Sequence, residues 1–124
     1  MFEVGIVAQF EAAHHLQGDF GPASRVHGHT YRVEVAARGA TLREDGTLFD
    51  IVTLQEATDG VLARIHFRNL DEVDLFAGRN TTAEVVAQVL CEEIAPRLSG
   101  AGLSSLAVRV WESPLAYAGY EVDL

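Results

Sequence analysis

The sequence predicts an α+β fold in the order ββααββ: a four-stranded antiparallel sheet with two helices on one face. Apolar and polar residues alternate in long runs near both ends of the chain, over 2–14, 27–38, 103–113 and 117–122. A period of two is typical of strands with one buried face. Between these runs, 51–65 and 82–98 carry apolar residues at three- and four-residue spacing, which indicates amphipathic helices. Two helices covering one face of a sheet form a common layered architecture.

The first two strands are expected to bring three histidines together. His14 ends the first strand on the parity of its apolar face, whereas His15 has the opposite parity. His27 and His29 begin the second strand, and residues two apart in a strand project from the same face. If these strands pair as an antiparallel hairpin across the intervening loop, His14 comes opposite the other two histidines.

Three imidazoles on one sheet face indicate a metal site. A catalytic zinc ion usually takes three protein ligands and keeps its fourth tetrahedral position open. The alternative is that these are strand-end histidines with ordinary hydrogen bonds. The spacing H-x12-H-x-H uses three of the five histidines and favours Zn2+ on His14, His27 and His29. His15 is not expected to be a ligand.

Composition narrows the class of protein. With 124 residues, the chain is expected to form one domain, 1–124. The net charge of −9 argues against a nucleic-acid partner, and the absence of lysine excludes a Schiff-base mechanism. No run of residues resembles a signal peptide or a membrane span. The single cysteine, Cys91, fits a small core residue in a reducing compartment, so a cytoplasmic protein is expected.

The middle of the chain supplies the start signals of both helices. Asp50 is a suitable N-cap for the first helix, in which Gly60 lowers helix stability by up to about 1 kcal/mol relative to alanine. Residues Thr81 to Glu84 form a predicted capping box at the start of the second helix. The connection 66–80 between the helices is expected to be a loop.

A carboxylate in the third strand suggests a ligand contact. Glu112 shares its parity with the apolar residues of 103–113, and a carboxylate on a buried face is costly unless it is hydrogen-bonded. Either it meets solvent or an arginine at the frayed strand end, or it reaches a pocket and accepts N–H donors from a ligand. The open face and edges of such a sheet favour pairing with other subunits.

On these residues the chain resembles the 6-pyruvoyl-tetrahydropterin synthase / 6-carboxy-tetrahydropterin synthase family. The motifs follow the order of the family over nearly the whole chain, and the combination F-x-A-A-H with H-G-H is the most specific of them. The matching residues are Phe10-Glu11-Ala12-Ala13-His14, His27-Gly28-His29, Asp50, Asn69-Leu70-Asp71, Thr82-Ala83-Glu84 and Glu112.

The resemblance implies the tunnelling fold, with subunits assembled into a homo-oligomer, a hexamer of stacked trimers, whose sites lie between subunits. It implies Zn2+ on the same three histidines. It implies a carbon–oxygen lyase-like reaction on 7,8-dihydroneopterin triphosphate. Glu112 would anchor the guanidine-like edge of the pterin, with Thr82 and Glu84 near the pocket.

The chain differs from the family at the residues that transfer protons, a cysteine and an Asp-His pair. The family pattern C-x-x-x-H-G-H has Ala23 in place of the cysteine, and the Asp-His pair of L-D-H-x-N-L-D is replaced by His66 and Phe67. A one-residue shift would instead place His66 at the histidine position, still without its aspartate.

Residues that could replace the proton carriers are His66, Asp19, Ser24 and Asp71. The unperturbed pKa of a histidine side chain lies in the suitable range, which favours His66, although a helix-end histidine can simply interact with the helix dipole. For Asp19 and Ser24, the alternative is that they only stabilise the turn in which they lie. Arg79 is a candidate for substrate binding: either it contacts an anionic substrate tail or it is a solvated loop residue.

Three hypotheses follow. The first is a zinc-dependent enzyme of this family with altered proton carriers, acting on dihydroneopterin triphosphate or a related pterin. The second is a non-catalytic oligomer that kept zinc and binds a pterin or purine. The third is a structural oligomer in which zinc only joins two strands. Structural zinc sites normally close with four protein ligands, so three histidines disfavour the third.

Overall fold

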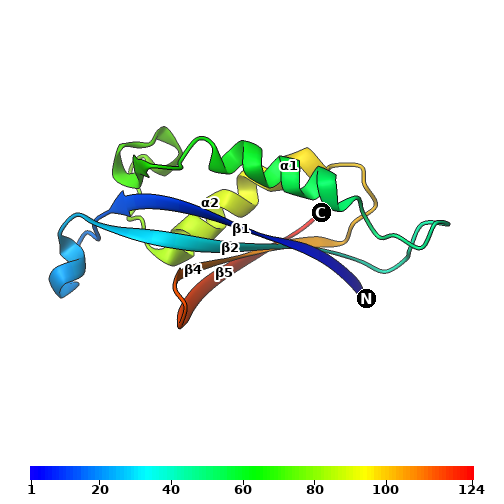
Figure 1. The fold of residues 1–124 in the computed structure, drawn as a ribbon, viewed down its shortest axis with the longest axis horizontal. Coiled ribbons are helices and arrows are strands. Elements are labelled where there is room, and N and C mark those ends of the chain that lie inside the picture. The colour runs from blue at the N-terminus through cyan, green and yellow to red at the C-terminus, as the bar shows by residue number, and fades with distance from the viewer.

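The computed structural model describes all residues, 1–124, as a twisted sheet with two helices on one of its faces (Figure 1). The strands are β1 (Phe2–His14), β2 (His27–Gly39), β3 (Arg68–Asn69), β4 (Ser105–Ser113) and β5 (Ala116–Asp123). The helices are α1 (Ile51–Leu62) and α2 (Ala83–Ile94). In the sheet the strands lie in the order β3-β1-β2-β4-β5.

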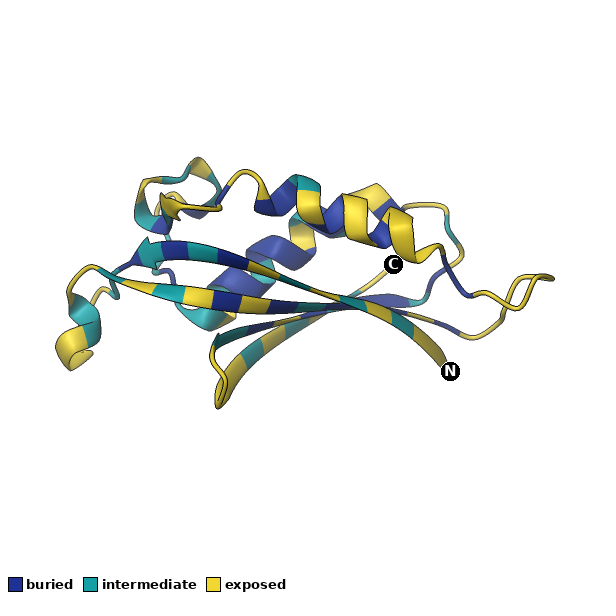
Figure 2. Cartoon of the chain, viewed as in Figure 1, coloured by how far each residue is buried: buried dark blue, intermediate teal, exposed yellow.

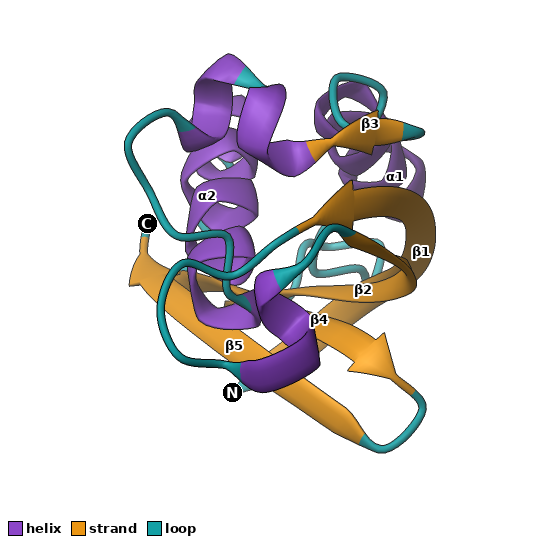
Figure 3. Ribbon diagram, turned by 90° about the vertical axis from the view of Figure 1, so that its left-hand side faces the viewer, coloured by secondary structure: helices purple, strands orange, loops and turns teal.

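The prediction of a four-stranded antiparallel sheet is wrong in one respect, because the sheet has five strands and is mixed. The additional strand, β3, pairs in parallel with the end of β1 through Arg68 and Asn69 (Figure 3). Just before it, the Phe67 N–H donates to the Glu11 carbonyl at 2.7 Å. A two-residue strand is too short to produce a visible alternation of apolar residues, so this segment was expected to be a loop.

The hairpin of β1 and β2 has the predicted register. The two strands pair without interruption from Phe2 opposite Gly39 to His14 opposite His27. On the face below the helices, the rings of Phe10 and Tyr31 stack at 4.6 Å between centroids, and both are fully buried. Buried and more exposed positions alternate along the strands (Figure 2). Since neighbouring side chains of a strand face opposite ways, one face of the sheet packs under the helices and the other is more exposed. The same alternation therefore builds the core and directs the histidines toward the helix side.

The N-cap residue predicted from the sequence is confirmed for α1 and is wrong for α2. Asp50 caps α1, because its carboxylate accepts from the Val52 N–H at 3.3 Å. The predicted capping box is wrong: Thr82, and not Thr81, is the N-cap of α2, and its hydroxyl accepts from Val85 at 3.2 Å. Glu84 is therefore one position too early to complete a box.

Both helices end before the predicted residues. α1 ends at Leu62 and α2 at Ile94, where a 3-10 turn of Ala95–Leu98 containing Pro96 takes over. Within α2, Cys91 is fully buried, and its thiol lies 3.5 Å from the Leu106 carbonyl oxygen. Neither helix has the length and apolar character required to cross a membrane.

Candidate functional site

The three predicted histidines meet at the end of the β1–β2 hairpin. His14 is the last residue of β1 and His27 the first of β2, and His29 lies opposite Ala12 in the ladder. One ring nitrogen from each histidine lies within 4.8 Å of those of the other two. His14 is almost completely buried, whereas His27 and His29 are half-buried. The hairpin register thus produces one cluster that is open on its outer side.

Hydrogen bonds assign the tautomers of two of these rings. His14 Nδ1 lies 2.8 Å from the Thr81 carbonyl oxygen, and His27 Nδ1 lies 2.7 Å from the Arg25 carbonyl oxygen. A carbonyl oxygen only accepts hydrogen bonds, so in both neutral rings Nδ1 carries the proton. The remaining nitrogen, Nε2, therefore has a free lone pair in each ring.

The unpaired nitrogens of the cluster fit a metal ion. His14 Nε2 and His29 Nε2 are buried and have no hydrogen-bond partner in the chain, which is costly for polar atoms unless a ligand satisfies them. Burial lowers the pKa of His14, the Thr81 carbonyl opposes this effect, and His27 and His29 lower the pKa further. The neutral imidazole is the form that binds metal ions.

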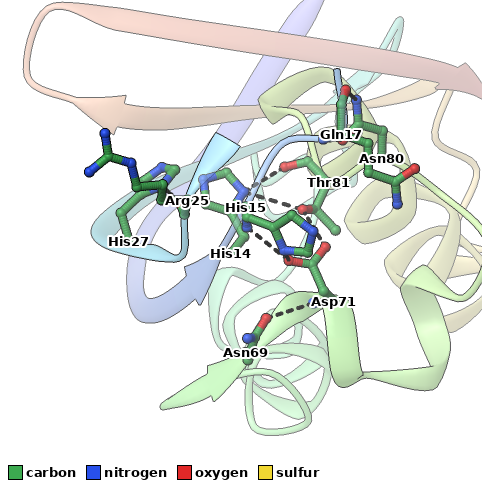
Figure 4. A network of polar contacts seen from close by, with 9 residues as sticks. All are labelled: His14, His15, Gln17, Arg25, His27, Asn69, Asp71, Asn80 and Thr81. Carbon is green, nitrogen blue, oxygen red and sulfur yellow. Dashed lines mark hydrogen bonds and ion pairs between the residues drawn. The ribbon is translucent and has the colours of Figure 1, made fainter. Parts of the chain in front are cut away.

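Asp71 lies behind the cluster at the centre of a polar network (Figure 4). Its Oδ1 accepts from the Thr81 hydroxyl at 3.0 Å, and its Oδ2 accepts from the His15 backbone N–H at 2.8 Å. The His15 Nδ1 also lies 2.9 Å from Oδ2. His15 is thus turned toward Asp71 and is absent from the histidine cluster. This network joins residues more than 50 positions apart, and only the Asn69-Leu70-Asp71 motif hinted at it in the sequence.

Glu112 borders a groove that also reaches His29. It lies at an irregularity in the pairing of β4 with β5, between Trp111 and Ser113. The groove has a volume of about 530 Å³. Its lining residues are Gly28, His29, Thr30, Arg32, Trp111, Glu112, Ser113 and Pro114. None of the four ion pairs of the chain involves Glu112, so its carboxylate is not neutralised by an arginine of its own chain.

A buried phenol adjoins the same histidines. The Tyr31 ring lies 5.2 Å from that of His29 and 6.0 Å from that of His14, and its hydroxyl has no partner in the chain. Burial, and then the charges of Glu112 and Asp71, raise the pKa of Tyr31 well above its usual value. The phenol thus stays protonated and can donate a hydrogen bond to a bound molecule. In the sequence, Tyr31 shares the parity of His27 and His29, but no pattern there assigns it a role.

The predicted binding residues of α2 lie apart from this groove. Thr82 is half-buried and caps the helix, and Glu84 is exposed in its first turn. Neither lines the groove beside Glu112. Their neighbour Thr81, which contacts His14, is the residue that connects this segment to the cluster.

His66 also lies outside the histidine cluster. Its Nδ1 accepts from the backbone N–H of Glu11 at 3.1 Å, and its exposed ring packs on Phe67. Phe67, with a positive φ of 58° and 75% of its surface exposed, borders a second groove that also includes His29. In the ungapped comparison, the two positions that the resemblance assigns to the Asp-His pair therefore carry a histidine bound to the strand backbone and an exposed phenylalanine.

Of the remaining candidate residues, Ser24 and Arg79 have local partners. The Ser24 hydroxyl donates to the Gly18 carbonyl at 2.9 Å and accepts from the Phe20 N–H at 3.2 Å, so it stabilises its own turn. Asp19 is exposed in the same loop. The guanidinium of Arg79 donates to Gln88 at 2.7 Å.

Fold and site together define a class: an α+β protein with a three-histidine cluster beside a carboxylate-bearing groove. The family model for 6-pyruvoyl tetrahydropterin synthase matches residues 3–123, and the chain belongs to this family of tetrahydropterin synthases. Its fold is the tunnelling fold of that family.

Relatives and a solved structure agree with the assignment. A Pyrococcus horikoshii protein with the provisional name 6-carboxy-5,6,7,8-tetrahydropterin synthase is 32% identical over 133 residues, covering 89% of this chain and 83% of the relative. A dihydroneopterin monophosphate aldolase of Pyrococcus furiosus is 31% identical over 93 residues, covering 75% of each chain. The structure of the Caenorhabditis elegans 6-pyruvoyl tetrahydropterin synthase matches with a TM-score of 0.85 and 26% identity, covering 98% of this chain and 96% of the other.

Proposed function

We propose that this chain is a zinc-dependent, lyase-like enzyme acting on 7,8-dihydroneopterin triphosphate or a related pterin. The observation that carries the proposal is the pair of buried, unpartnered Nε2 atoms on His14 and His29 beside His27. Such nitrogens are the ligands that zinc prefers in catalytic sites. The cluster contains three groups and no fourth, which supports an open coordination position over a purely structural role.

In this proposal His14, His27 and His29 hold Zn2+, which when bound supplies Lewis-acid chemistry to oxygen atoms of the pterin side chain. Glu112 accepts two N–H donors from the guanidine-like edge of the pterin, a charge-assisted and geometrically specific interaction. The groove shared by His29 and Glu112 supports placing both contacts on one ligand. Tyr31, protonated and unpartnered, is a suitable hydrogen-bond donor beside them.

Thr82 and Glu84 are proposed binding residues on the family resemblance alone. Their place at the start of α2, next to Thr81, keeps them at the same end of the molecule as the cluster. We also propose a homo-oligomer, a hexamer of stacked trimers in the cytoplasm. The exposed outer edge of β5 and the incompletely covered edge of β1 support pairing between subunits.

His66 is the proposed proton carrier. Its Nδ1 accepts a hydrogen bond from the Glu11 N–H, so in the neutral ring the exposed Nε2 carries the proton and can deliver it. Because His66 is outside the histidine cluster of its own chain, it would serve a site formed with a second subunit. Substituting His66 by alanine tests this role, because unchanged turnover would remove it from the mechanism.

The alternative is a non-catalytic pterin- or purine-binding oligomer of the same fold. It is favoured by the side chains at the family's proton-transfer positions, since Ala23 and Phe67 cannot titrate. In that case the zinc and the Glu112 contact would serve binding only.

The deciding experiment incubates the zinc-loaded protein with 7,8-dihydroneopterin triphosphate, and separately with dihydroneopterin monophosphate. Release of triphosphate, or of a shortened pterin, would be followed by mass spectrometry. Turnover that depends on zinc and disappears in Glu112→Gln would establish the enzyme. Tight pterin binding without any product would establish the alternative, and neither binding nor turnover would refute both.

A further inference from the structure

We propose that Asp71 is a positioning residue that, through Thr81, sets the tautomer and orientation of His14 before a metal ion binds. The inference rests on the zinc site of the proposed function, although it assigns a role to a residue that neither touches the ion nor lines the groove. Its basis is a chain of hydrogen bonds from Asp71 to Thr81 to His14 (Figure 4).

The direction of each hydrogen bond in this chain is fixed by chemistry. An ionised carboxylate only accepts hydrogen bonds, so at 3.0 Å the Thr81 hydroxyl must donate its single proton to Asp71 Oδ1. The same hydroxyl oxygen then presents only lone pairs to His14 Nδ1, 3.3 Å away. The Thr81 carbonyl oxygen, 2.8 Å from Nδ1, is the nearer acceptor, and the hydrogen bond from the Thr81 hydroxyl to Asp71 keeps this residue, and with it the carbonyl, against the ring. His14 Nδ1 therefore carries the proton, and Nε2 is left to bind metal.

Asp71 is itself held from three sides. Its backbone N–H donates to the Asn69 side chain at 3.0 Å, and its Oδ2 accepts from His15. Only 14% of its side chain is exposed, and Thr81 is fully buried. The carboxylate thus has little freedom to turn away, and it joins the end of β1 to the segment that precedes α2.

His27 provides the contrast within the same cluster. Its Nδ1 bonds to the carbonyl of Arg25, only two residues away and exposed to solvent. His14 instead depends on a partner 67 positions away in the sequence. Loss of Asp71 should therefore affect His14 and leave the tautomer of His27 unchanged. Such partners behind metal ligands typically contribute 10- to 100-fold to metal affinity.

The test measures the zinc affinity of the full chain by competition with a chromophoric chelator. Asp71→Asn and Thr81→Val should each weaken zinc binding about 10- to 100-fold. Thr81→Ser, which keeps the hydroxyl, should bind like the wild type. Asp74→Asn is the matched control, because it removes one charge from an exposed aspartate in the same connection.

A second readout follows the imidazole nitrogens of the zinc-free protein by long-range 1H–15N NMR. Wild-type His14 should show a protonated Nδ1, and Asp71→Asn should mix or reverse this tautomer while His27 is unchanged. If zinc affinity and the His14 tautomer both stay at wild-type values in Asp71→Asn, the proposal is overturned. Should Asp71→Asn fail to fold, the Thr81→Val and Thr81→Ser pair decides by the same two measurements.

The two proposals fail in different ways. A wild-type protein that binds no zinc would refute the zinc-dependent function. The tautomer measurement needs no metal, so it would still show whether Asp71 controls His14.

Discussion

The histidine cluster and the segment His66–Asn69 lie beside the same strand, β1, yet the chain supports them differently. His14 is buried and bonded to Thr81, behind which stands Asp71. His66 is exposed and bonded only to the strand backbone, and Phe67 beside it is also exposed. A single chain thus builds the histidine cluster and its supporting hydrogen bonds by itself. Under the proposed function, the half of the site that transfers protons would need residues of a second subunit.

The largest expected effect comes from removing a histidine of the cluster. His14→Ala should weaken zinc binding at least about 100-fold, since it removes a ligand and not merely a supporting partner. His66→Ala should leave zinc affinity within about twofold of the wild type. Competition with a chelator measures both variants, and equal losses in the two would erase the distinction between the halves.

The core between α2 and β4, which contains Cys91, should resist thiol chemistry. Burial raises the pKa of Cys91 to about 11 from an ordinary value of 9.0. At pH 8 the folded chain should thus hold roughly 100-fold less thiolate than a free thiol and react correspondingly slowly with Ellman's reagent. Rapid labelling of the folded protein would show that this side of the sheet opens readily.

The raised pKa of Cys91 also makes the stability of the folded state depend on pH. The folded state keeps the Cys91 proton more strongly than the unfolded state does, so its contribution is complete below about pH 9 and is lost as the pH rises towards 11. In urea unfolding experiments between pH 9 and 11, the free energy of unfolding should decline as the pH rises. The decline should be smaller in Cys91→Ala, which has no thiol to titrate.

Glu112→Gln tests whether the groove beside the histidine cluster binds the pterin. We expect pterin affinity to fall at least about tenfold, because a charge-assisted hydrogen bond is replaced by a neutral one. Zinc affinity should change much less, since Glu112 is absent from the histidine cluster and only its charge acts on His14. Calorimetric titration measures both, and unchanged pterin affinity would remove the proposed anchor.

The smallest effect concerns the backbone of the exposed segment. Phe67 has a φ of 58°, a conformation that glycine adopts without strain. Phe67→Gly should therefore raise the free energy of unfolding by up to about 1 kcal/mol, measured by urea denaturation. Phe67→Ala keeps the β-carbon and should give no such gain, so equal behaviour of the two variants would argue against strain at this position.

The sequence was informative wherever a regular period extended over many residues. The alternation of β1 and β2 predicted both strands and the meeting of His14, His27 and His29, because parity alone decides which face a side chain occupies. Asp50 was recognisable as a cap because its partner is two residues away. In such cases the pattern and the contact lie in the same short stretch of chain.

Features that depend on distant contacts could not be derived in this way. β3 exists only because Arg68 and Asn69 meet the end of β1. The folded chain turns the Thr81 hydroxyl toward Asp71 and His14, whereas the Thr82 hydroxyl accepts from the Val85 N–H and caps α2. Two adjacent threonines offer the same local signal, so only the folded arrangement distinguishes them.

The uninterrupted ladder between β1 and β2 restricts how this site can change over evolutionary time. Inserting one residue just before Phe10 would turn it out of the core and His14 away from the helices in a single step, because neighbouring side chains face opposite ways. Core packing and the histidine cluster, with the metal site proposed there, would then be lost together. Phe67, which is exposed at the edge of the second groove, carries no such double constraint. Divergence should therefore accumulate around the opening of the site and spare the imidazoles at its base.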